Sequence, residues 1–525
     1  MKSLISHVSR CSTYWDHIPA KTVFSPLTAA IMCRSSPEAT RTKQNGFIAF
    51  CDEMGESVLV HERMLEKAGP QGMHLAKVGM VSLGCSKNLV DSEIMLGSLR
   101  RAGYHITADA SAADVIIVNT CGFIGTAKSE SINTILEMAT YKETGQCRAL
   151  IVTGCLSQRY SKELMEEIPE IDGMLGTGEL DRLPDLLQAV EQGLRVTFVG
   201  EPGFSYDELL GRVVTTAPHS AYLKIAEGCS HSCAYCVIPS LRGHYRSRSA
   251  SGIVGEARWL AENGARELIL IAQDTSAYGK DLPNSPGLPE LLRELGQIPE
   301  IHWLRVLYTY PTTFSPQLIQ EFAENPKICH YVDLPLQHAN NHVLERMGRG
   351  PVAEAQRRLI GELRKTMPDV ALRSSFIVGF PGETDGEFEE LLDFLAEIRF
   401  DHVGIFPYSA EEGTRAAELP AQIPEDVKEE RYNRAMQLQQ EISRSRNLAR
   451  VGEVYEVVID GPSEETDLVL VARSQYQAPE VDGAIYIGNR WLPAGAFAKA
   501  RIIEGYDYDL VAEIVEIGDD TPCNG

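Results

Sequence analysis

The sequence predicts a multidomain α/β protein in three successive parts: an N-terminal α/β domain with a parallel sheet, a central partial (β/α)6 barrel of the TIM kind, and a small C-terminal antiparallel β-barrel. Three observations lead to this prediction. The chain has 525 residues, which is too long for one hydrophobic core. Apolar runs alternate with amphipathic stretches from residue 77 to about residue 449, as parallel strands and helices do. After residue 451, short strand-like runs are separated by turn residues.

The composition of the chain indicates where its domains begin and end and in which cellular compartment it is expected. The first residues are rich in Ser, Thr and basic side chains, which fits either a disordered or mis-assigned leader or, less well, an organellar transit segment. The chain lacks a run of eighteen apolar residues and has twelve cysteines outside any short secreted framework, so we expect a cytoplasmic protein. The expected parts are a leader (1–74), an N-terminal domain (75–190), a linker (191–216), a central domain (217–448), a barrel (449–518) and a tail (519–525).

Three cysteines of the N-terminal domain follow three predicted strands. Strands are expected over 78–83, 114–118 and 149–152, each with a helix after it, and Cys85, Cys121 and Cys155 come just past their ends. Ligands bind at the carboxyl edge of such sheets, so the three thiols can meet although they are distant in sequence. We therefore predict a cluster site here. Three unrelated thiols remain the alternative, because Cys147, Cys329 and Cys523 belong to no motif.

A second set of cysteines opens the central domain. Cys229, Cys233 and Cys236 lie close enough together for one loop to hold three irons of a [4Fe–4S] cluster and leave the fourth iron open. The same spacing also matches one face of a helix, but Gly228 and nearby serines and proline disfavour a helix. A zinc site would need a fourth ligand, for which His231 is a candidate.

The cysteine loop follows the first of six predicted strands of the central domain. A barrel of parallel strands has its active face at their carboxyl ends, where the loop falls. The other predicted strand ends also carry polar residues, of which His338 and His402 are more simply explained by packing. The strands are expected over 221–225, 267–271, 302–307, 331–334, 375–378 and 403–406, and the helices over 253–262, 289–295, 316–324, 353–366, 387–398 and 425–449.

The charge of the chain restricts its partners. The net charge is −24, which argues against broad, nonspecific binding of nucleic acid. Residues 451–525 hold fifteen acidic and four basic residues, a net charge of −11. A small barrel that grips RNA should be basic. The acidic barrel instead favours a basic protein partner.

Five motifs carry a resemblance to a known family, the radical-SAM (S-adenosylmethionine) methylthiotransferases. From residue 77 to about 516 the chain resembles this family, which has an N-terminal cluster domain, a radical-SAM core and a C-terminal TRAM domain. The sequences of these motifs are most similar to those of the branch that adds a methylthio group to the β-carbon of an aspartate in the twelfth small-subunit ribosomal protein. Branches that modify tRNA share the same core. The motifs occupy residues 82–93, 119–124, 154–160, 271–279 and 379–384.

The resemblance implies two [4Fe–4S] clusters and SAM as cofactors. The cluster on Cys229, Cys233 and Cys236 would cleave SAM, and the one on Cys85, Cys121 and Cys155 would deliver sulfur, with no side-chain acid or base as catalyst. The residues expected to hold SAM are Tyr235, Gln273, Asp274, Gly379, Gly382 and Glu383, although the Gly379–Gly382 segment could equally be only a tight turn.

The expected partners are a basic ribosomal protein as substrate and a flavodoxin-like or ferredoxin-like electron donor, and the sulfur donor is left open. We expect a monomer. Two other functions remain open at this point. A tRNA methylthiotransferase shares every cysteine motif, and the acidic barrel disfavours it. An iron–sulfur electron carrier or redox sensor normally gives each cluster four protein ligands, whereas each set here offers three.

Overall fold

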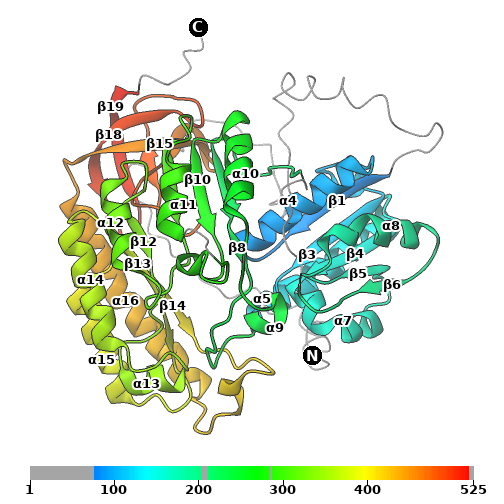
Figure 1. Ribbon diagram of the computed structural model, residues 1–525, viewed down its shortest axis with the longest axis horizontal. Helices are drawn as coiled ribbons and strands as arrows, with labels where there is room; N and C mark the ends of the chain where they lie inside the picture. The colour runs from blue at the N-terminus through cyan, green and yellow to red at the C-terminus, as the bar shows by residue number, and fades with distance from the viewer. Residues whose placement is uncertain (1–75, 204–210, 284–286, 519–525) are drawn as a thin grey trace, which may run out of the picture. The chain divides into compact units, whose positions relative to one another are not determined.

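The computed structural model describes residues 76–203, 211–283 and 287–518 (Figure 1). The predicted leader and Cys523 lie outside these ranges. The chain divides into two compact units. The first contains the described residues up to Asn88 together with Leu99–Val199, and the second contains Leu89–Ser98 and the described residues from Gly200 onward. The middle of one helix, α4 (Ser86–Arg101), therefore belongs to the second unit.

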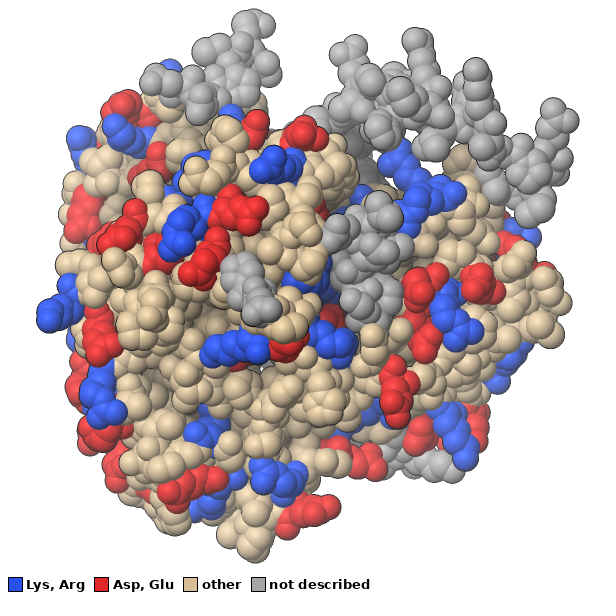
Figure 2. All heavy atoms as spheres, in the orientation of Figure 1, with Lys and Arg blue, Asp and Glu red and all other residues tan. Residues whose placement is uncertain are grey.

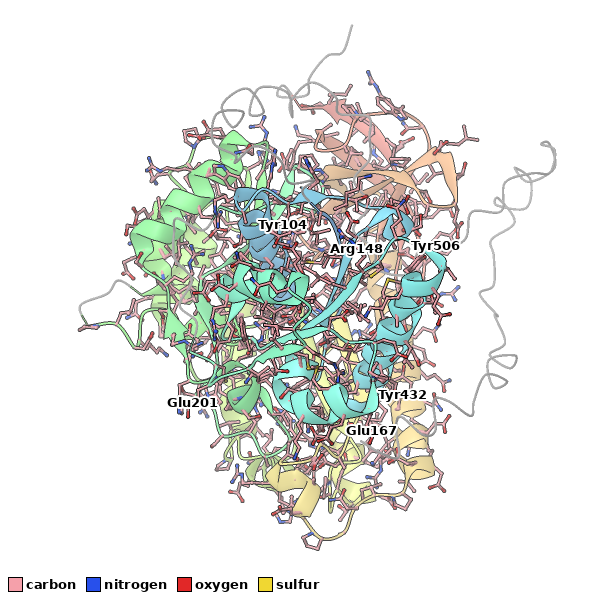
Figure 3. All side chains as sticks on the ribbon, turned by 90° about the vertical axis from the view of Figure 1, so that its right-hand side faces the viewer. Tyr104, Arg148, Glu167, Glu201, Tyr432 and Tyr506 are labelled. Carbon is pink, nitrogen blue, oxygen red and sulfur yellow. The ribbon has the colours of Figure 1, made fainter. Side chains whose placement is uncertain are left out.

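The first unit is built on a six-stranded parallel sheet, as predicted, with strand order β2-β1-β3-β4-β5-β6. Every residue of β3 and β4 is buried, because helices cover both faces of the sheet. Arg148, labelled in Figure 3, precedes β4 and donates to Asp114 at 3.2 Å. The strands are β1 (Lys77–Ser82), β2 (His105–Ile106), β3 (Val115–Thr120), β4 (Ala149–Gly154), β5 (Gly173–Leu175) and β6 (Val196–Phe198), and the helices include α5 (Gly125–Ala139), α6 (Tyr141–Thr144), α7 (Cys155–Glu167) and α8 (Leu183–Glu191).

The prediction of a linker over residues 191–216 is wrong about where the linker begins. Strand β6 lies inside that range and pairs in parallel with β5, so residues to Phe198 belong to the sheet. The helix before it, α8, begins with Leu183 and Pro184. Proline is tolerated in the first turn of a helix because its missing N–H has no partner there. The sheet thus has six strands where the sequence indicated three, because the short strands β2, β5 and β6 were not predicted.

The core of the second unit is the predicted six-stranded partial barrel. Its strands form two parallel three-stranded sheets, β11-β10-β7 and β12-β13-β14. A parallel bridge between Leu304 and Ile328 continues the first sheet toward β12. Apolar residues between these strands and the helices form a continuous core. The elements are β7 (Ser220–Lys224), α10 (Ala250–Glu262), β10 (Glu267–Ile271), α11 (Leu288–Leu295), β11 (Trp303–Val306), α12 (Pro316–Glu324), β12 (Tyr331–Asp333), α13 (Asn341–Arg346), α14 (Ala353–Thr366), β13 (Ala371–Val378), α15 (Asp385–Ile398), β14 (His402–Pro407) and α16 (Glu425–Ala449).

The C-terminal part is a closed five-stranded barrel with strand order β15-β16-β17-β19-β18. The expectation of a wholly antiparallel barrel is wrong in one pairing, since β17 and β19 run parallel. After β17 the chain crosses the barrel before β18 pairs with β15, and β19 then returns between β17 and β18. The strands are β15 (Val454–Ser463), β16 (Thr466–Ser474), β17 (Ile485–Ile487), β18 (Phe497–Gly505) and β19 (Leu510–Ile517).

Buried charged groups join this barrel to the amino ends of the core strands. Glu267, at the start of β10, accepts from Arg305 at 2.8 Å and from Arg473 of the barrel at 2.9 Å. Arg473 also binds Asp460 at 2.7 Å, and Asp460 lies 3.0 Å from His219. Burying a charge is costly unless it is paired and hydrogen-bonded, so these ion pairs allow the charged groups to lie inside the protein.

Across the described residues, no helix is both long and apolar enough to cross a membrane.

Candidate functional site

The three N-terminal cysteine loops meet at the carboxyl edge of the first sheet. Gly84 has a φ of +93°, and a Cβ placed there would lie 2.9 Å from the Cβ of Cys121 and 3.3 Å from its Sγ. A Cβ on Gly122 would lie 2.7 Å from the carbonyl oxygen of Cys155. The glycines thus allow neighbouring cysteine loops to approach more closely than any other residue would permit.

Asn88 ties the same loops together. Its side-chain nitrogen donates to the carbonyl of Leu83 at 2.9 Å and to that of Thr120 at 3.0 Å. Its Oδ1 lies 3.8 Å from the Sγ of Cys155, and Asn119 donates to its backbone carbonyl at 2.8 Å. Asn88 lies in the motif at residues 82–93, and the sequence alone indicates no role for it. The available signal was an asparagine three residues after Cys85.

The donor set at this edge fits a cluster with three protein ligands. Cys85 is exposed, Cys121 is partly exposed and Cys155 is buried, so the site opens to solvent on one side. Within the described ranges, no three His, Cys, Asp or Glu side chains lie close enough to hold a single metal ion. A cubane cluster makes a different demand, because each thiolate binds a different iron and the ligands are spread more widely.

The second cysteine set lies in an irregular loop, with no helix between Gly228 and Cys236. The interpretation as one face of a helix is therefore wrong. Burial raises the pKa of Cys229 to about 11 and that of Cys236 to about 12, and the neighbouring thiols of the set add to both shifts. The three thiols are thus close enough to act on one another. Iron that binds here must displace their protons.

His231, inside this loop, is held by the next strand ends. Its Nε2 lies 2.7 Å from Oδ2 of Asp274, which follows β10. Its ring stacks on Tyr310, beyond β11, with 3.8 Å between ring centroids and 9° between planes. Asp274 is buried and also caps a short 3-10 helix through the amide of Ala277. Both Asp274 and the ring of Tyr310 therefore orient the cysteine loop.

Gln273, the neighbour of Asp274, carries an unused acceptor. Its Nε2 donates to Glu227 at 2.6 Å, whereas its buried Oε1 has no hydrogen-bond partner among the described residues. Glu227 also binds Lys224 at 2.8 Å and Arg242 at 3.3 Å. Burial alone would raise the pKa of Glu227, but Lys224 and Arg242 outweigh it and lower that pKa. A buried acceptor without a donor is costly, so Gln273 is a candidate for a ligand contact, and its contact with SAM stays a prediction.

The turn after β13 contains the remaining predicted SAM residues. Gly379 and Gly382 have φ values of +70° and +76°, which favour glycine. Glu383 is buried, and its carboxylate accepts from the amide of Gly379, from Arg431 at 2.8 Å, and lies 3.0 Å from Nε2 of His338. Glu383 thus fixes the turn through protein groups. Contact of these residues with SAM stays a prediction.

His338 and His402, for which the sequence favours packing, both bond to protein groups. His338 is fully buried against Glu383. His402 begins β14, at the strand end opposite the cysteine loop, and lies 2.9 Å from the carbonyl of Tyr476.

Three stretches of the chain match known families. Residues 77–176 match the uncharacterized protein family UPF0004, residues 223–395 the radical SAM superfamily and residues 451–515 the TRAM domain. The chain is 52% identical over 440 residues to the ribosomal protein uS12 methylthiotransferase RimO of Pelotomaculum thermopropionicum, covering 84% of this chain and 99% of that relative. It is 51% identical over 444 residues to RimO of Desulforamulus reducens, covering 84% of this chain and all of that relative.

A solved structure shares the fold of this chain. The radical S-adenosylmethionine methyltransferase TsrM from Kitasatospora setae, with cobalamin and a [4Fe–4S] cluster bound, aligns with a TM-score of 0.50 at 15% identity. The alignment covers 65% of this chain and 77% of that protein. At this identity the likeness shows the fold alone.

Proposed function

The chain belongs to the RimO family of ribosomal protein uS12 methylthiotransferases, and we propose that it adds a methylthio group to the β-carbon of an aspartate of the twelfth small-subunit ribosomal protein. It is a radical-SAM transferase, an enzyme that uses an iron–sulfur cluster and SAM. The observation that carries the proposal beyond the family is the presence of a three-cysteine site in each of the two units.

The site on Cys229, Cys233 and Cys236 is the proposed place of SAM cleavage. A reduced cluster held there supplies the electron that splits SAM and so allows hydrogen to be removed from an unreactive carbon. The protein's part is positioning. Oε1 of Gln273 would accept a hydrogen bond from the amino group of SAM, and the glycine turn after β13 would allow close backbone approach.

The site on Cys85, Cys121 and Cys155 is the proposed place of sulfur delivery. A second three-ligand cluster would keep one iron free for a sulfur species. The exposure of Cys85 supports this role, because a sulfur donor must reach the site. Asn88 and the glycines of these loops hold the three cysteines together before iron binds.

The acidic barrel is the proposed docking surface for the basic ribosomal protein. Glu464, Glu465 and Asp467 form an exposed acidic tip between β15 and β16, next to Leu468, whose side chain is 70% exposed. On the face drawn in Figure 2, the described residues show acidic side chains among basic ones and no continuous basic stripe of the kind that follows a nucleic-acid backbone. These features favour a protein recipient over tRNA.

An anaerobic assay tests the catalytic part of the proposal. Reconstituted, chemically reduced protein is mixed with SAM and the purified ribosomal protein. We expect 5′-deoxyadenosine together with a methylthio-modified substrate. Formation of 5′-deoxyadenosine without any modified protein, combined with modification of tRNA in a parallel reaction, would contradict the proposed recipient while leaving the radical-SAM chemistry intact.

A further inference from the structure

Arg349 lies against the loop that carries Cys229, Cys233 and Cys236. It follows α13 in the turn of the second unit that faces this loop, 114 residues from Tyr235. One guanidinium nitrogen donates to the hydroxyl of Tyr235 at 3.0 Å, and the other donates to the carbonyl of Pro335 at 3.0 Å. Tyr235 directly precedes Cys236, so Arg349 holds the loop beside its third cysteine.

The turn before Arg349 is fitted to the same loop. The amide of Ala234 donates to the carbonyl of Met347 at 2.8 Å. Gly348 has a φ of +75°, and a Cβ placed there would lie 2.7 Å from the carbonyl oxygen of Ser232. A backbone approach this close fixes where the side chain of Arg349 begins.

An aromatic ring fixes the other side of the guanidinium. The Cζ of Arg349 lies 4.2 Å from the ring centroid of Tyr310, whose ring also stacks on His231 at 3.8 Å. Two planar groups cannot share one ring face at these distances, so Tyr310 lies between His231 and Arg349. Cation–π contact of this kind stabilises a charged guanidinium in a site with little water.

The contacts of this turn lie beside two of the three cysteines. Ala234 directly follows Cys233, and Tyr235 directly precedes Cys236. The guanidinium of Arg349 is always charged, and its hydrogen bond to the hydroxyl of Tyr235 keeps that charge next to the cysteine loop.

We propose that Arg349 is an electrostatic positioning residue that makes the cluster on Cys229, Cys233 and Cys236 easier to reduce. Reduction adds one electron, taken from the external reductant, to a cluster that three thiolates already make negative. A nearby positive charge stabilises the reduced form, because net charge and hydrogen bonding set the potentials of such clusters. The proposal rests on the iron–sulfur site of the radical-SAM domain and not on the identity of the recipient.

The test is a redox titration of the full chain followed by electron paramagnetic resonance, without SAM. Dithionite is the reductant, and Cys85, Cys121 and Cys155 are replaced by alanine throughout so that one cluster gives the signal. We expect Arg349→Gln to shift the midpoint potential to a more negative value and Arg349→Lys to stay near the parent. An unchanged potential in Arg349→Gln, or an equal shift in both variants, would overturn the proposal.

Iron content decides the case in which Arg349→Gln fails to hold its cluster. Retention of iron in Arg349→Lys alone supports a requirement for the charge, whereas loss in both variants assigns Arg349 a structural role only. The matched control is Arg415→Gln. Arg415 donates to the carbonyl of Ser232 in the same loop but is exposed, so water and salt screen its charge. Its removal should shift the potential less, and an equal shift would contradict the proposal.

Discussion

The cysteines of this protein differ in their surroundings, since some pack singly in the core and others lie where loops converge. Cys147 is buried and donates to the carbonyl of Ala149 at 3.3 Å, and Cys329 is buried beside Arg305. Both are satisfied as small core residues. Cys121 and Cys155 instead lie where glycines bring separate loops into contact. The two groups differ in convergence, because a single buried thiol packs in the core, whereas loops from three strand ends bring the proposed cluster ligands to one edge.

Replacing Cys121 by alanine should therefore separate the two proposed steps. We expect the variant to lose the methylthiolated product and yet to form 5′-deoxyadenosine at close to the parent rate, because the SAM-cleaving site lies in the other unit. Product and 5′-deoxyadenosine are measured by mass spectrometry in the same reaction.

The matched control for that variant is Cys147→Ala, which removes a buried thiol from the same unit. It should retain both activities and its full iron content. Normal product yield from Cys121→Ala would show that sulfur delivery does not depend on this site.

The unused acceptor of Gln273 gives a second prediction for a single residue. Gln273→Leu roughly keeps the volume and removes Oε1 together with the Nε2 that donates to Glu227, so the affinity for SAM should fall about tenfold, which corresponds to roughly 1.4 kcal/mol. The affinity is measured by equilibrium binding to the reconstituted protein, and iron content should not change. Gln439→Leu is the control, since Gln439 also has a buried Oε1 without a partner among the described residues but lies on α16 and donates to Phe400. Equal loss of affinity in both variants would exclude a direct contact.

Some of these residues could be predicted from sequence and others could not. Cys85, Cys121 and Cys155 could be proposed as a set because each follows a recognisable strand and parallel strands end at one edge. Cys229, Cys233 and Cys236 could be proposed because of their spacing within one loop. Arg349 was not, because its role depends on a turn 114 residues from Tyr235. Asn88 stood in a quoted motif, but only the fold shows that it bonds two separate loops. Residues that act across the fold leave no local pattern.

At the scale of elements, the long regular segments were predicted best. The helices α12, α14 and α16 have the bounds that periodicity indicated. The three-residue strands β5, β6 and β17 were missed, because three residues are too few to show an alternation of apolar and polar side chains. The longer strand β19 was missed as well, and with it the parallel pairing of β17 with β19, because pairing partners depend on the path of the chain between strands.

The junction of the barrel with the core predicts a pH dependence. Burial would raise the pKa of Glu267, but Arg473 and Arg305 outweigh it and lower the pKa from 4.5 to about 2. The ionised group therefore contributes stability that is complete above pH 4.5 and is lost as the pH falls toward 2. Glu267→Gln should destabilise the protein by about 3–5 kcal/mol at neutral pH, because it leaves buried Arg305 without a carboxylate partner and Arg473 with Asp460 alone.

Thermal unfolding of the iron-free protein between neutral pH and pH 4 measures this effect. The gap in midpoint between parent and Glu267→Gln should narrow as the pH falls. Glu397→Gln, which removes an exposed partner of Arg357, should change the midpoint little at any pH. A gap that widens toward acid would contradict the assigned charge state of Glu267.

At the scale of the whole molecule, charge distribution bears on the choice of recipient. Reversing Glu464 and Glu465 to lysine should weaken binding of the ribosomal protein about threefold to tenfold at moderate salt, since each exposed pair contributes roughly 0.2–1 kcal/mol. Reversing Glu143 and Glu166, which are exposed on the first unit, makes the same change in net charge and should have little effect. Binding is followed by titration calorimetry at two salt concentrations. Equal weakening by both pairs would mean that net charge, and not the barrel tip, governs association.

We propose that this chain places a methylthio group on a ribosomal protein. The most direct test compares a strain that lacks the gene with the same strain carrying it, by intact-mass analysis of the small-subunit proteins and by analysis of tRNA nucleosides. We expect the twelfth small-subunit protein to carry one methylthio group in place of a hydrogen, at an aspartate, only when the gene is present, with tRNA unchanged. An unmodified ribosomal protein together with a gene-dependent methylthio nucleoside in tRNA would contradict it.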